Sequence, residues 1–176
     1  MPTDPSARGG ILIGLDVLVV DDPNAPRPLD SAATALDRLS WIGRPIVMAG
    51  HELNGRRLPE ADDERVAWVR TAFGTDELEV HPFDEPEANR VGESSARDAI
   101  ARWAEVRDLW DATWLVTSRA TSVGPARRAR LAVIRIGPRA AEVAATVERA
   151  DHEARDLLDA VGHLLTLDAF AAEKQD

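Results

Sequence analysis

The sequence contains no cysteine. A chain without cysteine forms no disulfide, has no thiolate nucleophile, and cannot hold zinc or an iron–sulfur cluster through cysteine ligands. We therefore expect no redox function. The sequence also lacks the roughly 18 consecutive apolar residues of a membrane span, and its opening, MPTDPSARGG, lacks the charged and apolar regions of a signal peptide. These absences predict a cytoplasmic protein with no membrane partner.

Basic residues are in the minority, with 21 Lys and Arg against 31 Asp and Glu and a formal net charge of −10. Because nucleic-acid binding depends largely on basic side chains that neutralise phosphates, this balance argues against a nucleic-acid partner. One part of the chain departs from the acidic character. It contains a local basic cluster: Arg119, Arg127, Arg128, Arg130, Arg135 and Arg139.

The length of 176 residues and the hydrophobic content of 44% are enough for one domain with a substantial core. We predict a flexible N-terminus over residues 1–10, a single domain over 11–170 and a C-terminal tail over 171–176. The closing AFAAEKQD is expected to be frayed. If it is ordered instead, a contact with a partner or with a second copy is the expected reason.

Apolar runs alternate with helical patterns along the chain. The run ILIGLDVLVV (11–20) is typical of a strand buried on both faces of a parallel sheet. Further strands are predicted over 44–50, 78–83, 113–117 and 131–136, and helices over 30–42, 62–74, 94–110, 126–130, 140–150 and 152–165. This alternation predicts an α/β fold, with an open parallel sheet of about five strands covered by helices on both faces. Such folds bind ligands at the carboxyl ends of their strands.

Smaller features complete this reading. Asp30 or Ser31 is expected to cap the helix over 30–42, and Gly43 to end it. Trp103 and Trp110 are seven residues apart and share a helical face, which favours core packing over a partner contact. The HELNG segment (51–55) is interpreted as a loop, and the spacing of the four histidines does not indicate a metal site.

Four segments together resemble the haloacid-dehalogenase-like (HAD) superfamily, especially its compact phosphatase-like members. GLDVLVVDDPNAPRPLDSAATALDRL (14–39) resembles the opening strand, loop and first helix, and RPIVMAGHEL (44–53) resembles the second strand. WLVTSRATSVGPARRARLAVIRIGP (114–138) resembles the fourth and fifth strands, and ADHEARDLLDAVGHLL (150–165) the closing segment. The resemblance implies a HAD-like Rossmannoid three-layer sandwich with little or no cap domain. A different doubly wound domain is the alternative, because each motif alone is short.

The resemblance also implies a reaction that needs two aspartates. One is a nucleophile at the end of the first strand, and the other, two residues later, is an acid and base. If Asp16 is at the second position, Gly14 is at the first. An ungapped placement against VLVV puts Ile13 and Leu15 at the two positions, and a third placement leaves Asp16 as a lone nucleophile. No placement supplies both carboxylates.

The next two family motifs are altered as well. The hydroxyl side chain that holds the phosphate at the end of the second strand is replaced by Ala49, which Gly50 follows. The Lys or Arg that neutralises the phosphoryl group matches Val91, although the adjacent Arg90 could substitute for it. The phosphate-binding part of the site is therefore weakened in this sequence.

The fourth motif is an acidic pair in the pattern Gly-Asp-Ser-x-x-Asp, and both acids are replaced, by Thr117 and Thr121. Mg²⁺, which the family uses, is a hard cation held by carboxylates, so neutral hydroxyls are poor substitutes. Arg119, beside Ser118, would also repel a divalent cation. We expect no bound metal or other cofactor, and metal-dependent phosphoryl transfer that is absent or very slow.

Three functions remain open. The leading hypothesis is a catalytically inactive pseudophosphatase that serves as a binding, regulatory or assembly module, with a protein partner or with itself. One alternative is a divergent hydrolase that uses Asp16, Asp21 or Asp22, although the last two also suit a polar turn. Another is metal-independent binding of a small phosphorylated or anionic ligand. Its candidate residues are Asp16, Gly50, Arg90, Thr117, Ser118, Arg119 and Thr121, of which the Ser and Thr side chains would equally suit a helix cap.

Overall fold

A computed structural model describes residues 9–20, 27–42, 46–49, 52–53, 56–57, 93–137 and 148–173. Its centre is a five-stranded sheet in the order β4-β1-β7-β8-β9, in which every neighbouring pair is parallel. The strands are β1 (Ile11–Gly14), β4 (Ile46–Ala49), β7 (Trp114–Thr117), β8 (Ala132–Ile136) and β9 (His152–Ala154). The predicted α/β fold with a parallel sheet is confirmed. The strand expected over 78–83 and the helix expected over 62–74 lie outside the described residues.

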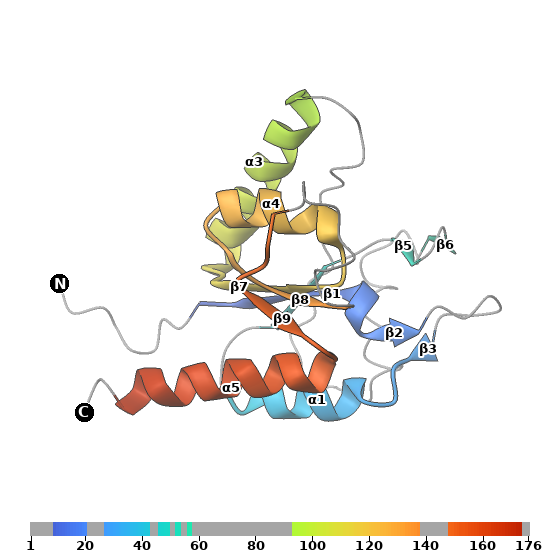
Figure 1. Ribbon diagram of the computed structural model, residues 1–176, viewed down its shortest axis with the longest axis vertical. Coiled ribbons are helices and arrows are strands. Elements are labelled where there is room, and N and C mark those ends of the chain that lie inside the picture. Colours follow the sequence, from blue (N-terminus) through green and yellow to red (C-terminus); the bar gives the residue numbers. More distant parts are fainter. Residues whose placement is uncertain are drawn as a thin grey trace.

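Helices cover both faces of this sheet (Figure 1). On one face, α1 (Ala32–Ser40) packs beside α5 (Leu157–Glu173), and on the other, α3 (Glu93–Trp110) packs beside α4 (Ala120–Arg128). The result is the three-layer sandwich that the sequence predicts. Within the described part of the chain, no helix is long and apolar enough to cross a membrane.

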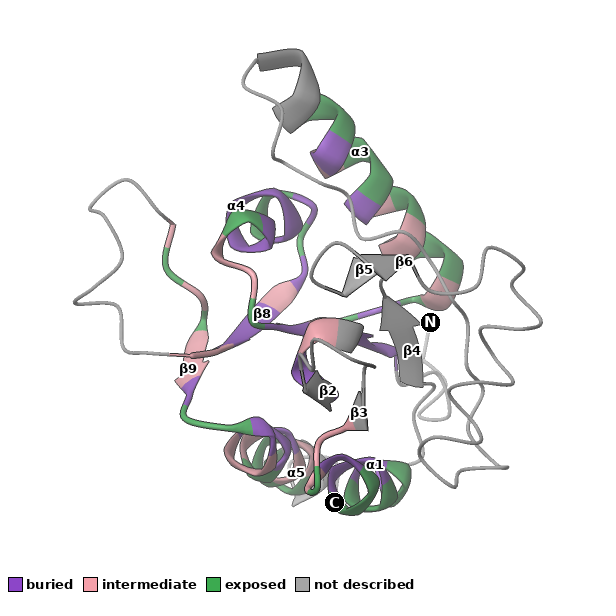
Figure 2. Cartoon of the chain, turned by 90° about the vertical axis from the view of Figure 1, so that its right-hand side faces the viewer, coloured by how far each residue is buried: buried purple, intermediate pink, exposed green. Residues whose placement is uncertain are grey.

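The core forms on both sides of the sheet because alternate strand residues point to opposite faces. Ile13, Val116 and Ile134 pack toward α1 and α5, whereas Leu12, Leu115 and Val133 pack toward α3 and α4. Figure 2 shows buried residues in the strands and in the helices on both sides of the sheet. Trp103 is completely buried in the second layer, so its predicted core role is confirmed.

The expected strand over 11–20 is interrupted after Gly14. A 3-10 turn, η1 (Leu15–Val17), follows, and then β2 (Val19–Val20) pairs with β3 (Arg27–Pro28) as a separate antiparallel hairpin. Val17 and Leu18 are nevertheless buried, in the core between the sheet and the helices α1 and α5. The apolar run in the sequence is therefore longer than the strand, because residues after the strand are also buried. A second hairpin, β5 (Glu52–Leu53) with β6 (Arg56–Arg57), lies where HELNG was expected to be a loop.

The first helix begins and ends differently from the prediction. Ser31 precedes α1 with helical backbone angles of φ −85° and ψ −9°, and its side chain makes no capping hydrogen bond. A capping side chain normally comes from an extended residue, so this backbone does not present the serine hydroxyl to the helix. The helix ends at Trp41 rather than at Gly43.

Three further element boundaries were wrong. The helix α4 begins at Ala120 and continues through Gly124 and Pro125, two residues that argue against a helix in the sequence. The predicted helix over 152–165 begins as the edge strand β9, and α5 starts only after Asp156, whose Oδ1 accepts a hydrogen bond from the backbone N–H of Asp159 at 2.8 Å. The same helix extends to Glu173, so most of the AFAAEKQD segment is helical rather than frayed.

Candidate functional site

Two polar segments meet at the carboxyl ends of β1 and β7. The register of these parallel strands pairs Ile13 with Val116, which brings the residues that follow each strand to the same edge of the sheet. Gly14 ends β1, and Asp16 lies in η1 directly after it. Thr117 ends β7, and Ser118 follows. The predicted ligand-binding edge of the fold therefore holds four of the candidate residues.

Asp16 and Ser118 are hydrogen-bonded to each other across this edge. The backbone N–H of Ser118 donates to Oδ2 of Asp16 at 2.8 Å, and the Ser118 hydroxyl donates to the same oxygen. The other carboxylate oxygen, Oδ1, is buried, and none of the residues that the structure describes forms a hydrogen bond with it. One oxygen of the carboxylate is thus fixed by two donors, while the other lies over Gly14.

Gly14 leaves the space that this carboxylate fills. A Cβ atom added to Gly14 would lie 2.1 Å from Oδ1 of Asp16 and 3.5 Å from the carbonyl oxygen of Val116. Because 2.1 Å is far below van der Waals contact, any side chain at position 14 requires Asp16 to move. The carboxylate of Asp16 therefore occupies the volume into which a side chain at the end of β1 would project.

The beginning of α4 engages the remaining hydroxyl at this edge. Thr117 is completely buried, and its Oγ1 accepts a hydrogen bond from the backbone N–H of Arg119 at 3.0 Å. Arg119 is the N-cap residue of α4, and its own side chain makes no capping hydrogen bond. Thr121 is exposed in the first turn of the helix. The Thr117 hydroxyl therefore supports the helix start.

Arg135 and Glu153 lie next to this edge, although the sequence did not assign them to it. The sheet register pairs Thr117 with Arg135 and Arg135 with Glu153. The side chain of Arg135 is only 7% exposed, and its Nε lies 2.9 Å from Oε2 of Glu153. The only sequence signal was a lone charge in the apolar run LAVIRI. The basic cluster is consequently divided, because Arg127, Arg128 and Arg130 are at the opposite end of α4.

The other predicted positions are less informative. Ala49 ends β4 directly beside Gly14 in the sheet, with no hydroxyl to offer. Gly50, Arg90, Val91, Asp21, Asp22 and Arg139 lie outside the described residues.

The donors at this edge do not fit Mg²⁺. Asp16 follows β1 at this edge, and two hydrogen bonds already occupy its Oδ2. The Thr117 hydroxyl is engaged with the N-cap of α4. Across the described ranges, no group of three or more His, Cys, Asp or Glu side chains comes together in a way that could hold a metal ion. Because Mg²⁺ binds through carboxylates in octahedral geometry, this arrangement is a poor ligand set.

Two histidines are in contact where the edge strand β9 meets α5. The rings of His152, in β9, and His163, in α5, stack with centroids 3.7 Å apart and an interplanar angle of 2°. Trp114 contacts His163 edge-on, with centroids 6.2 Å apart. Burial lowers the pKa of His163, and the charge of a protonated His152 lowers it further, while Asp159 acts in the opposite direction.

No family model and no curated protein matches the sequence. Solved structures do resemble the fold. A D,D-heptose 1,7-bisphosphate phosphatase from Burkholderia thailandensis is 11% identical, with a TM-score of 0.65, over 90% of this chain and 99% of that one. The enzyme of the same name from B. bronchiseptica, complexed with magnesium and phosphate, is 15% identical, with a TM-score of 0.63 over the same shares. An L-2-haloacid dehalogenase from Xanthobacter autotrophicus is 18% identical, with a TM-score of 0.52, over 80% of this chain and 62% of that one.

These neighbours establish the fold. The described part of the chain has a HAD-like fold, as its motifs and their order predict. At these identities the likeness concerns the fold and not the activity.

Proposed function

We propose that this chain is a pseudophosphatase, a HAD-like domain that does not catalyse Mg²⁺-dependent phosphoryl transfer and instead serves as a binding module for a protein partner. The observation that carries the proposal is the hydrogen-bonded pair of Asp16 and Ser118 over Gly14. In this proposal Gly14 and Asp16 correspond to the two aspartate positions of the family.

The missing nucleophile is the first part of the argument. A covalent phosphoryl-transfer mechanism needs one carboxylate for attack and a second group for proton transfer. Position 14 carries no side chain, and the Asp16 carboxylate fills the adjacent volume. A single carboxylate that is tied to Ser118 cannot serve as nucleophile and as acid and base at the same time.

The missing charge stabilisation is the second part. Phosphoryl transfer is catalysed almost entirely by positioning and by electrostatic stabilisation of the transferred group. Thr117 and Thr121 stand where the family has acids, and the Thr117 hydroxyl is already hydrogen-bonded to Arg119. The ligand set that would position Mg²⁺ is therefore not supported by the described residues.

The same contacts weigh against a phosphate-binding role for this edge. An anion at the start of α4 would use the backbone N–H and hydroxyl of Ser118. Both groups already donate to Asp16, whose negative charge would repel a second anion. A metal-independent anion site at this edge therefore has less support than the pseudophosphatase.

Exposed aromatic side chains support the proposal that the chain binds a protein partner. Trp41 at the end of α1 is 72% exposed, and Phe170 near the end of α5 is 58% exposed. Both helices lie in the same layer of the fold (Figure 1). Because large aromatics are enriched among interface hot spots, this layer is the favoured surface for a protein partner.

A divergent hydrolase is the second candidate, and one observation favours it. Oδ1 of Asp16 is buried and accepts no hydrogen bond from the described part of the chain. A carboxylate oxygen with this freedom at the end of β1 is a potential nucleophile, although no second carboxylate assists it among the described contacts of Asp16.

Thermal-shift titration with Mg²⁺ and with vanadate, a phosphate mimic, tests the proposal. The two are added separately and together to wild type and to Arg119→Ala, with the magnesium-binding phosphatase from B. bronchiseptica as a positive control. We expect Mg²⁺ to produce no stabilisation alone and to add nothing to any effect of vanadate. Stabilisation that requires both together would overturn the pseudophosphatase.

A further inference from the structure

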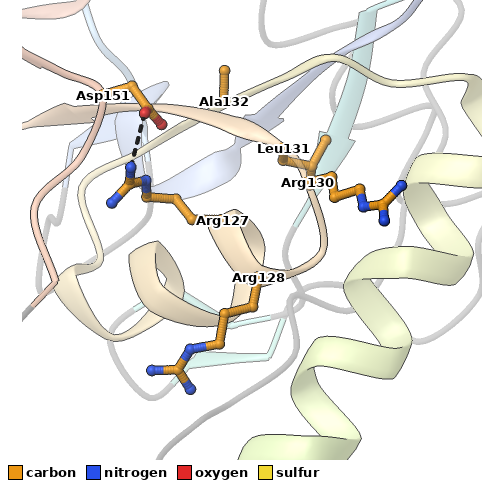
Figure 3. A pocket seen from close by; sticks show the side chains of 6 residues that line it. All are labelled: Arg127, Arg128, Arg130, Leu131, Ala132 and Asp151. Carbon is orange, nitrogen blue, oxygen red and sulfur yellow. Dashed lines mark ion pairs between the residues drawn. The ribbon is translucent and has the colours of Figure 1, made fainter.

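A hollow lies at the far end of α4, at the amino-terminal edge of the sheet beside the first residue of β8. The hollow is shallow and open to solvent, with a volume of about 390 Å³. Figure 3 shows the residues that line it, Arg127, Arg128, Arg130, Leu131, Ala132 and Asp151. Three arginines therefore line the hollow together with one carboxylate, that of Asp151, to which Arg127 is turned, in a chain whose net charge is −10. The hollow is a local positive surface that the overall composition does not predict.

Two of these arginines are engaged with acidic side chains through exposed contacts. Arg127 lies 3.2 Å from Oδ1 of Asp151 and donates to the backbone carbonyl of Arg149 at 3.0 Å. Arg128 pairs with Glu148, and the two arginine side chains are 41% and 54% exposed. Exposed ion pairs contribute little to stability, so a multivalent oxyanion that offers bidentate contacts can compete for these guanidinium groups.

Arg130 differs from the other two. Within the described part of the chain, its guanidinium has no hydrogen bond or ion pair. Its backbone φ is +69°, in the left-handed region where glycine is the usual residue after a helix. Position 130 thus combines a strained backbone with an unpaired charge, whereas glycine would relieve the strain and remove the charge.

The geometry points to a second binding site in this hollow, for a small molecule that carries two linked phosphate or carboxylate groups. Figure 3 shows Arg127 turned toward Asp151 and Arg130 extending on the other side of Leu131. This separation suits two anionic groups better than one. Leu131, which is 3% exposed, gives the site an apolar wall. The inference does not depend on the proposed function, because Asp16 and Ser118 lie at the opposite end of α4.

Pyrophosphate is the probe for this site, with orthophosphate as the single-charge-centre comparison, both titrated at constant ionic strength and followed by calorimetry. The variants are Arg130→Gly and Arg130→Asn, since both replacement residues tolerate the left-handed backbone. The matched control is Arg38→Ala, which removes an exposed arginine from α1 on the other face of the sheet. Thermal unfolding of each variant checks that the fold is retained, and Arg130→Gly should not lower the melting temperature.

We expect wild type and Arg38→Ala to bind pyrophosphate more tightly than orthophosphate, and both Arg130 variants to bind it at least about tenfold more weakly, since contacts with charged groups are the strong ones. Equal affinity in wild type and the Arg130 variants, equal affinity for the two anions, or no binding at all would overturn the inference. A loss of binding in Ser118→Ala but not in Arg130→Gly would also overturn it, because it would locate the anion at the other end of α4.

Discussion

The backbone N–H and the hydroxyl of Ser118 donate hydrogen bonds to the same oxygen of Asp16, and the two residues are 102 positions apart in the sequence. This contact connects the turn after β1 to the start of α4. Because the acceptor is ionised, its hydrogen bonds are stronger than those between neutral groups. The contact therefore contributes to the fold at the carboxyl ends of the strands, where open α/β sheets bind their ligands.

Replacing Ser118 by alanine removes one of the two donors to Asp16. We expect Ser118→Ala to lower the free energy of unfolding by about 1.5 kcal/mol, the lower end of the range for hydrogen bonds to charged groups, since the backbone donor remains. Denaturant unfolding measures the change. The control is Ser40→Ala, whose hydroxyl donates to the exposed Asp37 carbonyl at 2.6 Å and should change stability by less than about 0.5 kcal/mol. Equal losses in the two variants would contradict a special role for Ser118.

A side chain at position 14 should compete with Asp16 for space. An added Cβ would lie 2.1 Å from Oδ1 of Asp16, so Gly14→Ala should destabilise the protein by about 1–3 kcal/mol, as overpacked cores do. In an Asp16→Ala background the same substitution should cost clearly less. Denaturant unfolding of the four proteins gives the coupling energy between the two positions. Additive effects would mean that the carboxylate does not occupy this volume.

The ion pair of Arg135 and Glu153 should be sensitive to the loss of one partner. The arginine side chain is 7% exposed and its partner 28% exposed, so Glu153→Gln removes the negative charge that this nearly buried cation pairs with. We expect a loss of about 3 kcal/mol, the lower end of the range for broken buried pairs. The double variant Arg135→Met with Glu153→Leu should be closer to wild type in urea unfolding. A loss below about 0.5 kcal/mol for Glu153→Gln would contradict this account.

The stacked histidines predict a loss of stability in mild acid. The pKa of His163 is lowered in the folded state, chiefly by burial, so the unfolded chain takes up a proton first as the pH falls through about 6.5. The stability that this histidine contributes is present above that pH and is lost as the pH falls toward its folded-state pKa. We expect unfolding free energies measured between about pH 7.5 and 5.5 to decrease less in His163→Phe, which retains an aromatic ring, than in wild type. Identical pH dependence would contradict the prediction.

Strong local patterns predicted the layers of the fold. The apolar runs of β1 and β8 and the helical periodicity of α3 gave the correct elements because each buries a face with the period of its own secondary structure. The edge strand β9 was missed because it has three residues and is followed closely by a helix. The early start of α4 was missed because Gly124 and Pro125 disfavour a helix locally, yet both are buried in it.

The sequence predicted where the candidate site lies, but not which of its residues contact one another. The carboxyl ends of the strands follow from a parallel fold, so Asp16, Thr117 and Ser118 were identified as candidates. Their mutual contacts depend on the register between β1 and β7, which no local pattern specifies. The filling of the space over Gly14 and the pairing of Arg135 with Glu153 are tertiary features of the same kind.

The most direct test of the central claim is the turnover of a generic ester, p-nitrophenyl phosphate, by wild type and by Asp16→Asn in the presence of Mg²⁺. Asp16→Asn retains the size of the side chain and removes its charge, so it reports contaminating phosphatase activity. The account predicts that wild type turns over the ester no faster than Asp16→Asn. Turnover by wild type that requires Mg²⁺ and is lost in Asp16→Asn would contradict it and would make Asp16 an essential residue of a working phosphatase.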